Sequence, residues 1–85
     1  MELSGRIHEI GTKQTITDKL TKQDLIILDE SNAQYPEYIK IEALNAKCDL
    51  LNNLSPGQRV TVSFNLKGRE SKGNYYNSLQ LWKIE

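Results

Sequence analysis

The sequence is poor in the features that mark exported and membrane proteins. Its 85 residues include a single cysteine, Cys48, which excludes an internal disulfide and fits a reducing compartment such as the cytoplasm. Residues 1–5 contain neither a basic nor an apolar stretch, so we expect no export signal. The longest apolar run covers only residues 25–28, against the roughly 18–20 residues of a membrane span. We therefore predict a cytoplasmic protein without a membrane segment.

Residue types used in catalysis and metal binding are equally scarce. His8 is the only histidine, and a general base would need a hydrogen-bonded partner and a cleft that the sequence does not indicate. Cys48 falls on the apolar side of a predicted helix, whereas a reactive cysteine needs an electropositive, partly exposed setting. One histidine and one cysteine cannot complete a zinc site, and neither a calcium motif nor a phosphate-binding glycine loop occurs. We predict no enzymatic activity, no metal and no cofactor.

An excess of charge of either sign is also absent. The net charge is zero, whereas a dedicated duplex binder usually carries a basic excess because neutralised phosphates drive its affinity. The charges are nevertheless unevenly distributed along the chain. Residues 11–22 carry a net +2, residues 23–50 a net −4 and residues 59–83 a net +4. The chain therefore has two basic segments separated by an acidic one.

The pattern of apolar residues predicts five strands, most of them from alternation with polar residues and the one at residues 25–28 from an unbroken apolar run. Gly5 lies inside the first of them and would weaken it, unless the strand bends there or another backbone approaches closely. The stretch between the first two strands, residues 11–23, has no clear period: Ile16 and Leu20 lie at helical spacing, but a long hairpin loop fits equally well. The predicted strands are residues 3–8, 25–28, 38–41, 60–67 and 75–84.

A single change of period occurs at residues 43–54, where Leu44, Cys48 and Leu51 share one helical stripe. Residues 55–58, Ser-Pro-Gly-Gln, end this helix. Three strands, a helix and two further strands follow one another in the order of the OB-fold, a five-stranded Greek-key barrel. We predict an all-β chain with one short helix (β-β-β-α-β-β) that forms a single OB-fold domain over residues 1–85.

The two basic segments coincide with the loops that flank the ligand in an OB barrel. Ligands lie there across the outer face of strands two and three, between the loop joining strands one and two and the loop joining strands four and five. Binders of single strands combine cations along the backbone with aromatic rings that stack on bases, at about 1–3 kcal/mol per stacked base. We therefore predict a single-stranded nucleic-acid (ssDNA) binding protein with little sequence specificity. Its predicted binding residues are Lys13, Lys22, Tyr38, Lys40, Arg69, Lys72, Tyr75 and Tyr76.

A protein-interaction barrel is the alternative function. The chain has only six aromatic residues, and Glu37 and Glu42 flank the predicted binding face. Such a barrel would form a homodimer through an edge strand or through Tyr75, Tyr76 and Trp82, or act as an accessory subunit of a larger complex. Trp82 falls on the outward side of the last strand by strict alternation. Either Trp82 is exposed there and can stack, or a bulge turns it into the core or against the helix. We favour packing, because large aromatics near the end of a small barrel more often fill it.

Short segments spread over nearly the whole chain carry a family resemblance. They are Glu2–Ile7, Tyr35–Pro36, Pro56–Gly57, Val60–Leu66, Gly68–Glu70 and Tyr76–Glu85. With them the chain resembles a family of small bacterial OB-fold proteins of unknown function, similar in shape to single-stranded-DNA-binding proteins. The family often has an aromatic followed by a Lys-Arg pair entering strand two. Here residues 20–24 keep only Lys22 of that pair. The resemblance implies the fold and leaves the function open.

Overall fold

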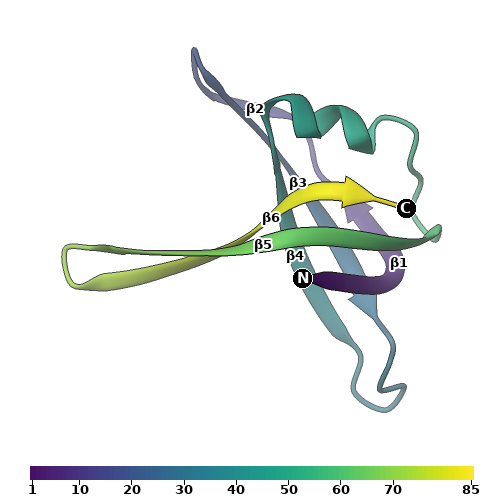
Figure 1. Ribbon diagram of the computed structural model, residues 1–85. Coiled ribbons are helices and arrows are strands. Elements are labelled where there is room, and N and C mark those ends of the chain that lie inside the picture. The colour runs from purple at the N-terminus through teal and green to yellow at the C-terminus, as the bar shows by residue number, and fades with distance from the viewer.

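The computed structural model describes residues 1–85 and shows a closed β-barrel with one short helix (Figure 1). Strands β1, β5, β6, β4 and β3 are neighbours in this order, and β1 also pairs with β3, which closes the barrel. The predicted fold class is confirmed, because five barrel strands and a helix after the third agree with an OB-fold. The elements are β1 (Glu2–Ile10), β2 (Gln14–Thr17), β3 (Leu20–Asp29), β4 (Glu37–Leu44), the 3₁₀ helix η1 (Asn45–Leu51), β5 (Arg59–Ser71) and β6 (Asn74–Ile84).

The core lies inside the barrel and is formed by the apolar side of each predicted alternation. Helix η1 contributes Cys48 and Leu51, and the Cys48 Sγ donates to the backbone carbonyl of Ala43 at 3.3 Å. No helix in the structure has the length and apolar character to cross a membrane. The buried cluster consists of Ile7, Leu25, Ile27, Ile41, Ala43, Cys48, Leu51, Val60, Val62, Phe64 and Leu81.

Gly5 lies where β1 passes from one neighbouring strand to the other. It pairs with Val60 of β5, and the next residue, Arg6, pairs with Leu28 of β3. A Cβ atom at position 5 would lie 2.5 Å from the Leu28 carbonyl oxygen and 2.7 Å from Ile27 Cγ2. The close backbone approach expected from a glycine in this strand is therefore present, and only glycine fits it.

The helix is shorter and tighter than predicted. It covers Asn45–Leu51 in 3₁₀ geometry instead of residues 43–54. Ala43 and Leu44 instead extend β4 by pairing with β3, and Asn45 has a φ of 52°, which starts the tighter turn. Cys48 and Leu51 of the apolar stripe are buried as predicted. Ala43 and Leu44 are held in the strand, because their pairing with β3 overrides their helical spacing.

Two hairpins extend the barrel strands beyond the predicted limits. The first consists of β2 and the start of β3, within the stretch predicted as a loop. The second, which we call the arm, consists of residues 66–79 and points away from the barrel in Figure 1. Its turn comprises only Lys72 and Gly73, with φ values of 52° and 80°, as in a type I′ turn. Residues 11–23 and 68–74 were expected only as loops between predicted strands. The paired extent of both hairpins escaped prediction because both of their faces meet solvent, so no apolar period marks them.

Trp82 is not part of the core, and the expectation that a bulge turns it inward is wrong. A register shift does occur here: Phe64 pairs with Leu81 and Ser63 with Lys83, so Trp82 is the extra residue. Its side chain remains 46% exposed. The bulge instead brings Ile84, which strict alternation placed outside, against the core.

Replacement of Gly5 by alanine tests the barrel closure. We expect Gly5→Ala to lower the free energy of unfolding by about 2–3 kcal/mol, because the new methyl group overlaps the Leu28 carbonyl and neither backbone can retreat without breaking strand pairing. Urea denaturation measures the loss. Ser4→Ala is the matched control, since it removes only an exposed hydrogen bond to Thr61 and should cost at most about 1 kcal/mol. Equal effects of the two variants would contradict this role of Gly5.

Candidate nucleic-acid groove

A polar groove of about 440 Å³ lies on the outer face of the barrel, where the arm leaves it. Its residues come from four strands that are neighbours in the sheet, in the order β3, β4, β6 and β5. The outer face of strands two and three of an OB barrel, here β3 and β4, is the position where such folds hold ligands. The groove is lined by Lys22, Glu42, Lys67, Gly68, Arg69, Tyr76, Asn77, Ser78 and Gln80.

Strand register determines which arm residues face the groove. Paired residues in an antiparallel ladder share one face, and successive residues alternate between faces. Lys67 pairs with Ser78 and Arg69 with Tyr76, so these four side chains lie on one face of the arm. The parallel pairing of Glu42 with Gln80 places β4 beside the base of the arm and completes the groove.

The arm side of the groove carries two cations without ion-pair partners. Neither Lys67 nor Arg69 takes part in any of the salt bridges of the structure. The guanidinium carbon of Arg69 lies 5.2 Å from the ring centre of Tyr76, within cation–π distance. This contact holds a flexible cation beside an aromatic ring that is itself exposed.

The opposite side of the groove is lined by Lys22 and Glu42. Asp24 does not line it but contacts Lys22, and we call these three residues the floor. Asp24 and Glu42 are directly paired across β3 and β4, an arrangement in which two carboxylates repel each other. The Lys22 Nζ lies 3.4 Å from Glu42 Oε1 and 3.8 Å from Asp24 Oδ1, so one cation compensates both. The floor therefore carries a formal charge of −1, whereas Lys67 and Arg69 contribute +2.

The structure brings three of the eight predicted binding residues together in the groove: Lys22, Arg69 and Tyr76. Lys40 lies on the same outer face, two residues before Glu42 on β4, but it does not line the groove.

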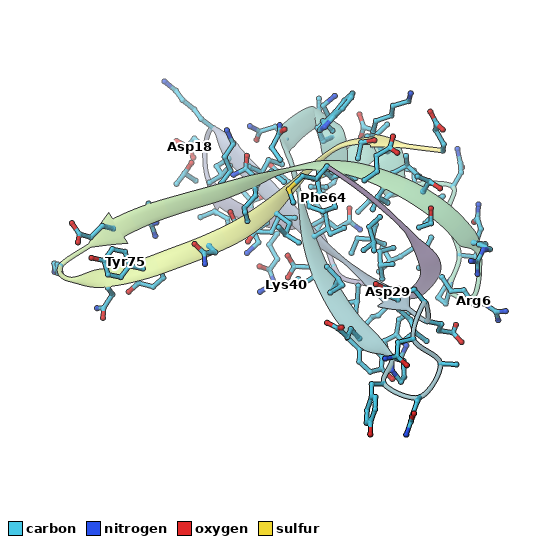
Figure 2. The ribbon with its side chains drawn as sticks, turned by 60° about the horizontal axis from the view of Figure 1, so that its bottom comes forward. Arg6, Asp18, Asp29, Lys40, Phe64 and Tyr75 are labelled. Atoms are coloured by element: carbon cyan, nitrogen blue, oxygen red, sulfur yellow. The ribbon has the colours of Figure 1, made fainter.

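The other four predicted residues lie elsewhere. Tyr75 is on the opposite face of the arm, towards its end (Figure 2), and Lys72 is in the turn at its tip. Lys13 is exposed in the connection between β1 and β2. Tyr38, near the start of β4, makes an edge-on contact with the His8 ring, with ring centres 4.8 Å apart.

Sequence reasoning missed most of the polar groove residues. Lys67 had a usable signal, because it stands two residues before Arg69 on the same strand and therefore on the same face. Glu42 was expected beside the binding face, but its contact with Gln80 and the arm had no signal in the sequence, because it depends on a single parallel pair between strands far apart in the chain.

The groups with shifted pKa values lie outside the groove. The backbone N–H of Ser31 donates to Asp29 at 3.0 Å and lowers the pKa of that carboxyl. The ion pair between Lys83 and Glu85 raises the pKa of the lysine and lowers that of the glutamate. All three side chains are at the surface, and these shifts reflect local pairing in turns and chain ends.

Together these features define an OB-like barrel with a bipolar groove on its outer face. The chain belongs to the family described as a domain of unknown function (DUF3127), whose match covers residues 2–85. This confirms the resemblance to a family of unknown function. A search of curated proteins gives no match.

Removal of the floor cation tests whether it compensates the two carboxylates. We expect Lys22→Met to lower the free energy of unfolding by about 1 kcal/mol at neutral pH, because Asp24 and Glu42 then face each other without compensation. The deficit should shrink in the background of Glu42→Gln, which removes one of the two carboxylates and with it their repulsion. Lys40→Met, on the same face but without an ion pair, is the control. A deficit that persists in the Glu42→Gln background would instead indicate lost packing of the lysine stem.

Proposed function

We propose that this protein is a non-catalytic module that binds single-stranded nucleic acid, DNA in the first place, in the groove beside the arm. The observation that carries the proposal is the pair of uncompensated cations, Lys67 and Arg69, next to the exposed ring of Tyr76 at the ligand position of an OB-like barrel. A cytoplasmic location is part of the proposal, and the lone buried cysteine supports it.

The free cations are the physical basis for affinity. A cation already paired with a carboxylate gains little from a phosphate, whereas an unpaired one releases the counterions that surround the nucleic acid. Lys67 and Arg69 are unpaired and lie two residues apart on the same face of β5, roughly 7 Å along the strand. Arg69 also orients the Tyr76 ring, on which a base can stack.

A single strand fits this groove better than a duplex does. The protein is neutral overall, and its free groove cations are confined to one side of a narrow hairpin. A duplex presents two phosphate backbones and hides the faces of its bases. A single strand can place its phosphates on the arm while one base leaves the stack and lies on Tyr76.

Fluorescence anisotropy with a labelled oligonucleotide of mixed sequence tests the proposal. We expect binding at low salt that weakens as salt rises. The double variant Lys67→Ala/Arg69→Ala should bind about tenfold more weakly, with a slope of log affinity against log salt shallower by about 0.7 per lost phosphate contact.

The matched control is Lys13→Ala/Lys19→Ala, which removes two cations from the β1–β2 connection and the turn of the β2–β3 hairpin, outside the groove. It should bind nearly as the unchanged protein does. No binding at micromolar protein and low salt, or an equal loss in both double variants, would contradict the proposed site.

A homodimer is the second candidate function, and one specific observation favours it. The face of the arm that points away from the groove carries Leu66 and Tyr75, which are 57% and 76% exposed. An isolated two-stranded hairpin is marginally stable in water, and its outer edges leave backbone groups unpaired. A second copy that covered this face would bury the apolar side chains and support the arm.

Sedimentation velocity over a wide range of protein concentration tests the dimer. A self-association through the arm should shift to monomer in Leu66→Ser/Tyr75→Ser, because both changes remove apolar contact area without touching the core. Nucleic-acid binding should survive, since neither residue lines the groove. A strict monomer at all concentrations would remove this candidate.

A further inference from the structure

The two sides of the groove have opposite charge, and a polyanion complements only one of them. Lys67 and Arg69 on the arm attract phosphates, whereas the net negative floor repels them. A ligand that fits both sides must be anionic at one end and rich in hydrogen-bond donors at the other. A nucleotide has this polarity when its base carries an exocyclic amino group.

The spacing of the strands suits such a ligand. β6 lies between β5, which carries the two cations, and β4, which carries Glu42. Two strand spacings amount to about 10 Å. Tyr76 and Gln80 project from the intervening strand, beside Arg69 and Glu42 respectively, and stand four residues, about 13 Å, apart along it. A bound single strand can therefore place a phosphate on the arm and one base on the tyrosine ring, while a neighbouring base presents its edge to the floor.

Glu42 has the right chemistry to recognise an amino group. Its carboxylate only accepts hydrogen bonds, its side chain is only 18% exposed, and one oxygen, Oε1, pairs with Lys22. The other oxygen, Oε2, contacts no donor of the protein. Gln80 lies directly beside it with both a donor and an acceptor. An acceptor next to an amide group matches the amino group and ring nitrogen of cytosine, whereas uracil and thymine present a carbonyl oxygen to the same carboxylate.

We propose that the floor selects bases with an exocyclic amino group, cytosine in particular, over uracil and thymine. This inference rests on the proposed function. The arm cations supply affinity for any sequence, and Glu42 adds a preference for particular bases.

The closest test compares oligo-dC with oligo-dU of equal length, because the two bases differ only at ring positions 3 and 4. We expect the unchanged protein to bind oligo-dC about tenfold more tightly at neutral pH and fixed salt, at the lower end of the discrimination that specific base contacts give. Glu42→Gln should bring the two affinities within about twofold, because an amide can turn to donate to the uracil oxygen. The salt dependence should stay unchanged, since the arm cations remain.

Two further variants keep the test decisive. Glu37→Gln makes the same chemical change at the exposed start of β4 and should retain the preference for oligo-dC. Gln80→Ala leaves the Lys22–Glu42 ion pair in place and should reduce the preference several-fold. It therefore tests the floor even if Glu42→Gln proves unstable.

The outcomes separate this inference from the proposed function. Salt-dependent binding of oligo-dC and oligo-dU with equal affinity would overturn the inference and leave the proposed function standing. A preference that survives Glu42→Gln would overturn the assignment to the floor. Absence of binding to either oligonucleotide would overturn both.

Discussion

The architecture depends on one close contact between two backbones, at Gly5. β1 pairs with β5 over Glu2–Arg6 and with β3 over Arg6–Ile10, so it closes the barrel by serving two neighbours in succession. This change of pairing partner along β1 requires the Leu28 carbonyl to occupy the space that a side chain at position 5 would need. Closure removes the free edges of the barrel itself, though not those of the arm, and brings β4 beside β6. The groove therefore depends on the absence of a side chain at Gly5, because it forms only when the closed barrel places β4 beside β6.

The inward-facing half of the fold was predictable from the sequence, and the outward-facing half was not. The alternation in β5 predicts a strand because one of its sides, with Val60, Val62 and Phe64, is buried in the core. The arm has no buried side, so residues 68–74, between the last two predicted strands, look like a polar loop although only Lys72 and Gly73 form the turn. Strand parity correctly places Arg69 and Tyr76 together and would have separated Tyr75 from Tyr76. Parity says nothing about which strands are neighbours, so the approach of Glu42 to the arm could not be predicted.

The neutral composition conceals an ordered separation of charge. An acidic middle segment and a basic later segment cancel in the sum, yet the barrel places part of each on opposite sides of one groove. On the floor, two carboxylates share Lys22. On the arm, the cations remain free. Net charge therefore predicts little about the local field here, because the field depends on which charges find partners after folding.

The arm contributes nothing to the buried core, and among its residues only Leu79 packs against it. Its backbone hydrogen bonds can open without unfolding the barrel, so its amide protons should exchange with solvent at far lower cost than those of Val62 or Ile27. Stability and recognition are thereby carried by different parts of one short chain. Mutations along the arm can alter which ligands are held while the barrel keeps its fold, which gives evolution freedom to vary the binding surface without destabilising the protein that presents it.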